Sequence, residues 1–220
     1  VKLLPAGSGD DTIYIDNDGN TAVIPTLRRQ SPDAGGGEMT ALSDYVCPSR
    51  HDERFPDWIG VFAVTVGEEI ENKIRSVKAT GDDYRMILYQ TVADRLPEAT
   101  TELLHRKVRR ELWGYAVNEP ENPDNLLVQY YEGIRPAIGY PSLPDQSLIF
   151  VTDTIIDYAS MGIMITENGA MSPASSTTGL MLSHPDSRYF IVGDIDETQR
   201  EDYAVRRGVP VDELRRFLSR

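Results

Sequence analysis

The pattern of apolar and polar side chains predicts an antiparallel sheet in the first third of the chain. Apolar and polar residues alternate over Thr12–Asp16, turn-forming residues fill Asn17–Asn20, and an apolar run resumes over Thr21–Pro25. Together these three segments predict a hairpin. The chain begins on what reads as another strand, and Trp58–Val66 is rich in β-branched and aromatic residues. The composition of Trp58–Val66 is typical of a buried central strand.

Helical periodicity dominates the middle of the chain. A first helix is predicted over Glu68–Ala79, and Asp82 and Asp83 then supply the acidic residues that favour a helix N-terminus. From there to Trp113 the apolar residues recur at steps of three and four, which is the spacing of one helical face. These residues are Tyr84, Leu88, Val92, Leu96, Ala99 and Leu103. We expect one long helix, kinked at Pro97 because proline lacks the backbone N–H.

The last third predicts further short elements without a regular alternation of strand and helix. The expected strands are Met161–Thr166, Thr178–Leu182 and Tyr189–Ile195, and the expected helices are Leu126–Tyr131, Glu197–Arg207 and Val211–Leu218. Strands clustered in this way indicate an α+β fold with a largely antiparallel sheet. With 220 residues and 40% hydrophobic content, residues 1–220 can bury a substantial core as a single domain.

Composition excludes several classes of function. The net charge of −13 argues against a nucleic-acid partner, and the one basic cluster, residues 106–110, is read as the solvated end of a helix. Cys47 is the only cysteine and the three histidines lie far apart, so no zinc or disulfide is expected in this chain. No apolar run approaches the length of a membrane span, which predicts a cytoplasmic protein with no membrane partner. Because no initiator Met precedes Val1, we expect a fragment of a longer polypeptide.

A proline-punctuated segment near residue 140 is the first candidate for a binding site. Prolines at 136, 141 and 144 exclude a helix or a central strand, and they stiffen the loop that follows Arg135. Arg135 offers a planar fork that fits a carboxylate, and Tyr140 offers a flat face with a polar tip. The alternative is a solvated arginine in a turn-rich connection.

Two acids on the long predicted helix form a second candidate. Asp94 and Glu98 stand four residues apart on one face and repel each other unless a cation lies nearby. Arg95 or a distant lysine could neutralise them, or a cationic ligand could bind there. Tyr189 also has two interpretations. It could contact a ligand, or it could be a half-buried tyrosine of a strand, which is equally common.

Short sequences along the whole chain resemble one known family in its own order. Two carry most of the likeness: the loop that reads Ile-Arg-Pro-Ala-Ile-Gly-Tyr-Pro over 134–141, and Ser-His-Pro-Asp-Ser-Arg-Tyr over 183–189. The others are Gly9–Tyr14, Asp57–Thr65, Asp82–Tyr84, Ala93–Leu96, Trp113–Glu119 and Glu201–Ala204. This ordered set is similar to the C-terminal activation domain of cobalamin-dependent methionine synthase. The family's fold, a long twisted antiparallel sheet flanked by helices, agrees with the α+β expectation.

The resemblance implies a reactivation module that binds S-adenosylmethionine and supplies its methyl group when cobalamin has been oxidised out of the cycle. In the full enzyme, a methyltransferase from 5-methyltetrahydrofolate to homocysteine, cobalamin and zinc belong to other modules. The implied partners are the cobalamin-binding module of the same polypeptide and reduced flavodoxin or a flavoprotein reductase. The isolated fragment can be inactive.

The resemblance also assigns roles to individual residues. Arg135 would pair the ligand carboxylate, and the Ala137 backbone and Tyr140 would hold the adenosyl or methionyl portion. Glu98 would act on the cationic side and Tyr189 would pack near the transferred methyl group. Phe190 is the sixth position of the ligand site, and Asp94 matches a residue implicated in contacts with the cobalamin-carrying module.

Departures from the family pattern keep other interpretations open. Phe190 stands where a second tyrosine is common, and Gln146 stands where a histidine often closes the proline-rich loop. The family also places another ligand-binding acid in a segment before Val1, which predicts weaker binding by this stretch alone. The alternatives are a docking or ligand-sensing protein on the same fold, or a stand-alone partner that reactivates another corrinoid enzyme.

Overall fold

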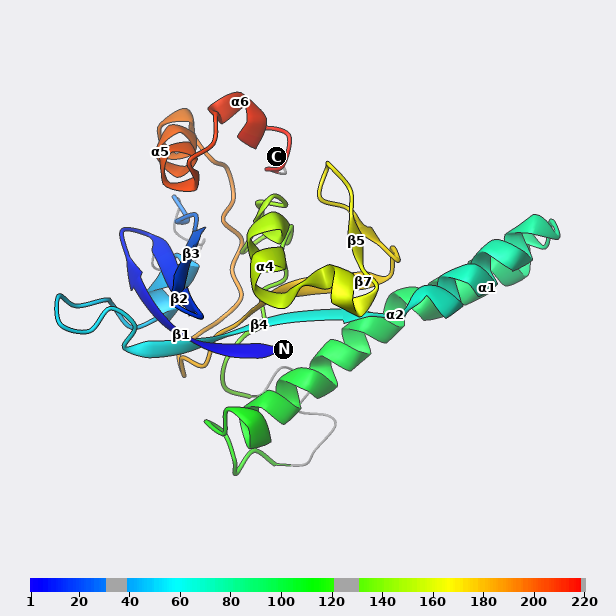
Figure 1. Ribbon diagram of the computed structural model, residues 1–220, viewed down its shortest axis with the longest axis horizontal. Coiled ribbons are helices and arrows are strands. Elements are labelled where there is room, and N and C mark those ends of the chain that lie inside the picture. The colour runs from blue at the N-terminus through cyan, green and yellow to red at the C-terminus, as the bar shows by residue number, and fades with distance from the viewer. Residues whose placement is uncertain (31–38, 121–130, 219–220) are drawn as a thin grey trace.

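A computed structural model of the chain describes residues 1–30, 39–120 and 131–218, and its centre is a curled antiparallel sheet (Figure 1). The five strands follow the order β3-β2-β1-β4-β7. Their bounds are Lys2–Gly9 for β1, Thr12–Asn17 for β2, Asn20–Pro25 for β3, Asp57–Thr65 for β4 and Ser176–Met181 for β7. A separate pair joins β5, Met164–Ile165, to β6, Met171–Ser172. The α+β class with an antiparallel sheet is therefore confirmed.

The helices flank this sheet. They are α1 (Glu68–Ala79), α2 (Asp83–Lys107), α4 (Leu148–Ile156), α5 (Glu197–Arg207) and α6 (Val211–Leu214). A π-helical turn, Val108–Leu112, continues α2, and 3-10 turns span Leu42–Tyr45 and Tyr158–Met161. In the described parts of the chain, every helix is too short or too polar to cross a membrane.

The N-terminal hairpins form because their turn residues adopt a left-handed backbone. Asp10 and Asp11 have φ of 47° and 55° between β1 and β2, and Asp18 and Gly19 have φ of 54° and 85° between β2 and β3. Two-residue turns of this hand match the twist of the flanking strands, and short acidic or glycine residues tolerate them. The predicted hairpin over residues 12–25 is confirmed.

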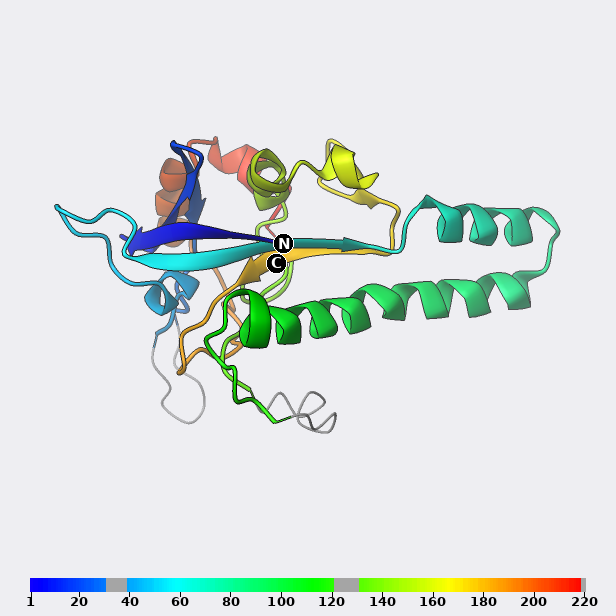
Figure 2. The same cartoon turned by 60° about the horizontal axis from the view of Figure 1, so that its bottom comes forward.

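Strand β4 is buried on both faces, so helices cover the sheet from two sides (Figure 2). Ile59 and Val61 belong to the main core, which also contains residues of α4. Phe62 and Val64 point the other way, into a smaller cluster with Val108 at the end of α2. Alternate side chains of a strand face opposite sides of a sheet, which explains the uninterrupted apolar run of β4.

Helices α1 and α2 form a hairpin that projects beyond the sheet (Figures 1 and 2). The buried face of α2 consists of Ala93, Pro97, Thr101 and His105, spaced four apart. By contrast, the apolar face that the periodicity identified is largely exposed, with Tyr84 at 79%. The helix itself was correctly predicted, and it continues past Pro97 to Lys107.

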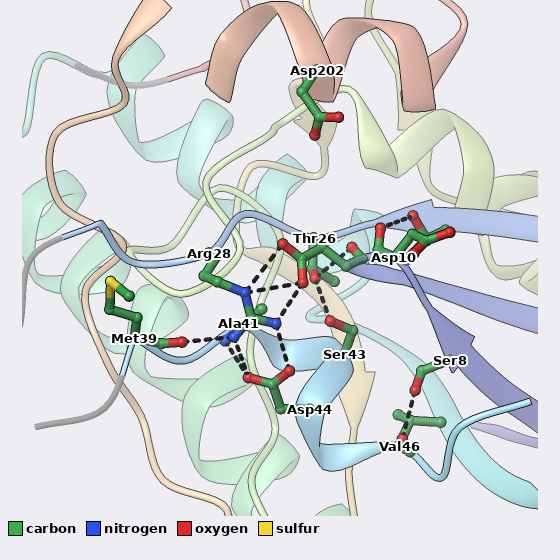
Figure 3. Close-up of polar contacts among 12 residues, drawn as sticks. Ser8, Asp10, Thr26, Arg28, Met39, Ala41, Ser43, Asp44, Val46 and Asp202 are labelled. Carbon is green, nitrogen blue, oxygen red and sulfur yellow. Dashed lines mark hydrogen bonds and ion pairs between the residues drawn. The ribbon is translucent and has the colours of Figure 1, made fainter. Parts of the chain in front are cut away.

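A polar cluster ties the end of β3 to the 3-10 turn at Leu42–Tyr45 (Figure 3). Arg28 donates to the carboxylates of Asp11 and Asp44 and to the carbonyl oxygen of Met39. Burial alone would raise the pKa of Asp44, but hydrogen bonds from Arg28 and from the Ala41 N–H outweigh it and lower that pKa. The cluster therefore holds Arg28 and Met39 beside the turn at Leu42–Tyr45.

Three predicted elements differ from the structure. Residues 189–195 form no strand, because the free edge of β7 is already paired by another segment, residues 134–138. The strand expected over Met161–Thr166 shrinks to β5, since Gly162 adopts a left-handed backbone with φ of 74°. The last helix ends at Leu214 rather than Leu218. Helix α4 was not predicted, and the helix expected over Leu126–Tyr131 lies, except for its last residue, outside the described residues.

Candidate ligand-binding site

The proline-rich loop lies against the free edge of β7. Ile134 exchanges two backbone hydrogen bonds with Leu182, of 3.0 and 2.9 Å, and the N–H of Leu180 donates to the carbonyl oxygen of Pro136 at 3.0 Å. Proline accepts at this edge without needing to donate, so Pro136 is compatible with the pairing. The loop is therefore an ordered extension of the sheet and not a solvated connection.

A cavity of about 510 Å³ opens between this loop, α2 and the segment that follows residue 188. Such a volume suits a small molecule of drug-like size. The cavity is lined by Phe62, Glu98, Thr101, Arg135, Pro136, Ala137, Tyr140, Pro141, Ser142, Thr177, Tyr189, Phe190 and Ile191. All six residues that the sequence suggested for a ligand site stand on this wall: Glu98, Arg135, Ala137, Tyr140, Tyr189 and Phe190.

Arg135 is the main cation of the cavity wall, and its side chain is only 17% exposed. Its Nη2 lies 2.6 Å from Oε2 of Glu102, and its Nη1 donates to the hydroxyl of Tyr131 at 2.7 Å. The backbone N–H of Arg135 donates to the Tyr189 hydroxyl at 2.9 Å. Burial by itself would lower the pKa of Arg135, but Tyr189, Tyr131 and Glu102 outweigh it and raise that pKa. The guanidinium therefore stays positively charged, and Glu102 and Tyr131 fix its position.

The two acids of α2 have different surroundings. Glu98 lines the cavity and pairs on its exposed side with Arg95, at 3.0 Å. Asp94 accepts hydrogen bonds of 2.7 Å from both Gln90 and Ser175. It lies in an adjoining cavity of about 220 Å³, which also has Glu98 in its wall. Asp94 is therefore next to the ligand cavity but not in it.

Two further residues singled out by the sequence, His184 and Gln146, lie outside the cavity wall. The Nδ1 of His184 accepts from the N–H of Asp186 at 3.2 Å, so this histidine orients its own loop. Gln146 donates to the carbonyl oxygen of Gly169 at 2.7 Å and borders the adjoining cavity. Phe190 packs against both the main core and the cluster beneath α5, and this packing requires no hydroxyl.

The sequence matches, over residues 1–208, the family described as vitamin B12 dependent methionine synthase, activation domain. The chain belongs to this family. The crystal structure of the MetH reactivation domain bound to AdoHcy resembles this activation domain with a TM-score of 0.89 and 38% sequence identity. That match covers 98% of this chain and 67% of the other.

Sequence reasoning did not single out five of the thirteen residues in the cavity wall of this activation domain, namely Phe62, Thr101, Ser142, Thr177 and Ile191. Phe62 and Thr177 come from β4 and β7, and Thr101 comes from the turn of α2 that follows Glu98. The alternation of β4 could have assigned Phe62 to the face opposite Val61. Nothing local marks Glu102, which lies behind the wall and becomes visible only through its contact with Arg135. Across the described residues, no three His, Cys, Asp or Glu side chains gather as a metal ion would require.

Proposed function

We propose that this activation domain binds S-adenosylmethionine in the 510 Å³ cavity and presents its methyl group to cobalamin. The observation that carries the proposal is the buried, paired guanidinium of Arg135 in the wall of a cavity of the right size. The similar MetH reactivation domain was crystallised with AdoHcy, which is the same molecule without the transferred methyl group.

The residues present fit the chemistry of this ligand. A guanidinium binds a carboxylate through two parallel charge-assisted hydrogen bonds, so Arg135 takes the amino-acid end. Glu98 supplies the negative charge that favours the cationic side of the ligand. The Ala137 backbone and the Tyr140 ring take the adenosyl or methionyl portion, and Tyr189 and Phe190 close the cavity near the methyl group.

The domain's own contribution to methyl transfer is positioning. The methyl group would leave the sulfonium with its bonding electrons remaining on S-adenosylhomocysteine, and the new bond would use an electron pair of the reduced cobalamin that another module brings. Holding the donor at a fixed angle converts an encounter between two molecules into a step within one complex. No proton has to move, so no general base is needed in the wall.

The proposal extends to the whole protein. Residues 1–220 would act as one module of a methyltransferase, in the same polypeptide as a cobalamin-binding module that approaches near Asp94. Reduced flavodoxin or a flavoprotein reductase would provide the electron, and a protein with these partners would act in the cytoplasm. A protein that only senses the ligand would bind it equally well. Transfer of a labelled methyl group from S-adenosylmethionine to reduced cobalamin distinguishes the two.

Isothermal titration calorimetry with S-adenosylhomocysteine tests the binding step. Arg135→Ala removes a charge-assisted bidentate contact and should cost about 2 to 3 kcal/mol of binding free energy. The control is Arg75→Ala, since the Arg75 side chain is 69% exposed on α1 and forms no part of the cavity wall. Equal affinities for the wild type and Arg135→Ala would refute the proposed role.

A further inference from the structure

The guanidinium of Arg135 is held from behind by two residues that do not line the cavity. Glu102 on α2 pairs with Nη2 at 2.6 Å, and Tyr131 accepts from Nη1 at 2.7 Å. The Tyr131 hydroxyl also lies 3.5 Å from Oε2 of Glu102, so the three groups form a closed triangle. An arginine has five N–H donors, so these two contacts leave others available, and the Arg135 side chain lines the cavity.

Tyr131 is itself fixed by a second layer. The guanidinium of Arg109 lies 3.8 Å over the centre of its ring, and the ring of buried His105 meets it edge-on at 5.5 Å. Arg109 is fully buried in the π-helical turn after α2 and forms a bidentate pair with Glu119, with one contact of 2.7 Å. The Tyr131 ring that contacts Arg135 is therefore packed against two buried side chains, Arg109 and His105.

This arrangement limits the conformational freedom that an arginine side chain must lose when it binds a carboxylate. A free arginine side chain samples many rotamers, and a bidentate contact requires its plane at one angle. Glu102 and Tyr131 restrict that plane before any ligand arrives, and Glu102 neutralises the charge while the site is empty. One carboxylate oxygen of Glu102, Oε1, is buried and has no hydrogen-bond partner among the described residues. Oε1 of Glu102 therefore lacks the hydrogen bonds to water that stabilise the carboxylate of a surface acid.

We propose that Glu102 and Tyr131 are positioning residues that fix the Arg135 guanidinium for the α-carboxylate of the ligand's amino-acid end. The inference rests on the proposed function, since it assumes a ligand with that carboxylate in the cavity. It predicts that the two residues contribute to binding only through the carboxylate and only through Arg135.

Two ligands separate this role from a general structural one. S-adenosylhomocysteine carries the carboxylate, whereas its decarboxylated analogue S-adenosyl-3-thiopropylamine lacks it and keeps the remaining atoms. In the full native chain, Glu102→Gln and Tyr131→Phe should each weaken S-adenosylhomocysteine binding by about tenfold. Binding of the analogue, measured by competition, should stay within about twofold of wild type because the carboxylate contact is absent. Matched controls are Glu69→Gln and Tyr84→Phe, both exposed on the α1–α2 hairpin.

A double variant supplies the second measurement. Adding Glu102→Gln to Arg135→Ala should cause no further loss of S-adenosylhomocysteine binding, since the group that Glu102 positions is already gone. Equal losses for both ligands, unchanged or tighter S-adenosylhomocysteine binding by Glu102→Gln, or additive losses in the double variant would each overturn the proposal. A wild-type chain that binds S-adenosylhomocysteine no better than the analogue would instead contradict the assigned role of Arg135, and this inference with it.

Discussion

Gly179 of β7 and Pro136 of the proline-rich loop approach so closely that no side chain fits between them. A Cβ atom at position 179 would lie 2.2 Å from the carbonyl oxygen of Pro136 and 2.8 Å from Cα of Ala137. Both neighbours are backbone atoms of the segment that carries Arg135. The absence of a side chain at Gly179 therefore sets where the proline-rich loop with Arg135 lies.

Gly179→Ala should displace the loop from the edge of β7. We expect a loss of about 1 to 3 kcal/mol in the free energy of unfolding from overpacking. Binding of S-adenosylhomocysteine should fall in parallel, because Arg135 moves with the loop. Urea denaturation and calorimetry measure the two effects.

Gly9→Ala is the matched control for this substitution. Its added Cβ would meet only the ring of Tyr14, at an ordinary 3.8 Å, so both stability and binding should stay near wild type. Wild-type affinity in Gly179→Ala would show that the close approach does not position the loop.

Local chemistry predicts much of this fold. The Asp-Gly turn at residues 18–19, the apolar run of β4 and the bounds of α1 all follow from short-range pattern, because each is decided by neighbours in sequence. The period of α2 is equally local. The sheet decides which face of α2 is buried. The face with Ala93 and Pro97 packs closely against the sheet, and larger side chains such as Tyr84 stay exposed on the other face.

The site depends on contacts that pattern alone cannot supply. Arg135 and Tyr189 meet across 54 positions of sequence, and only the family resemblance placed them together. Residues 189–195 have a composition typical of a strand, yet the edge that they would pair with is occupied by the loop. Glu102 looks like any acid on a helix until its distance to Arg135 is known.

Thr101 is expected to lower stability in the ligand-free protein. Its hydroxyl is buried and has no hydrogen-bond partner among the described residues, so the group loses its contacts with water and gains none in return. Thr101→Val should therefore leave the free energy of unfolding unchanged or raise it by about 1 kcal/mol.

Thr152→Val provides the contrast. The Thr152 hydroxyl is equally buried, but it bonds the Tyr158 hydroxyl at 2.6 Å and a carbonyl oxygen in α4. Its loss should cost about 1 to 3 kcal/mol because Tyr158 loses a partner in the core. Chemical denaturation of both variants decides the matter, and equal destabilisation by the two would show that Thr101 has an unseen partner.

Tyr189→Phe should weaken the attachment of the proline-rich loop at Arg135 and leave the packing of the core unchanged. The variant removes the oxygen that accepts the Arg135 backbone N–H at 2.9 Å. Tyr189 is partly exposed, so water can replace that oxygen and the loss should be about 1 kcal/mol, or roughly fivefold in S-adenosylhomocysteine affinity. Tyr84→Phe on the exposed face of α2 controls for the loss of a hydroxyl. Unchanged affinity of Tyr189→Phe would show that this hydrogen bond does not contribute to ligand binding.

Buried His105 should make the domain less stable in mild acid. Burial, together with the positive charges of Arg109 and Arg135, holds its pKa well below the ordinary value. The uncharged Tyr115 hydroxyl lies 3.3 Å from Nε2, the Tyr131 ring meets the imidazole edge-on, and Nδ1 is buried with no partner among the described residues. None of these described groups around the ring is an acid, so none of them compensates for a proton on the imidazole.

The sign of the effect follows from which state binds that proton. Above about pH 6.5 histidine is neutral in the folded and unfolded chains, so His105 contributes no pH dependence there. As the pH falls below that value the unfolded chain takes up a proton and the folded one does not. The free energy of unfolding should then drop by about 1.4 kcal/mol in total between pH 7.5 and 5.5 on account of His105.

Urea denaturation between pH 7.5 and 5.5 measures this slope. His105→Gln keeps a polar side chain that does not titrate, so its stability, whatever its starting level, should lose this part of the pH dependence. The difference between the two slopes isolates His105 from the carboxylates, which titrate lower. Parallel curves for wild type and His105→Gln would mean that the folded protein admits the proton, and that the layer behind Tyr131 is open to water.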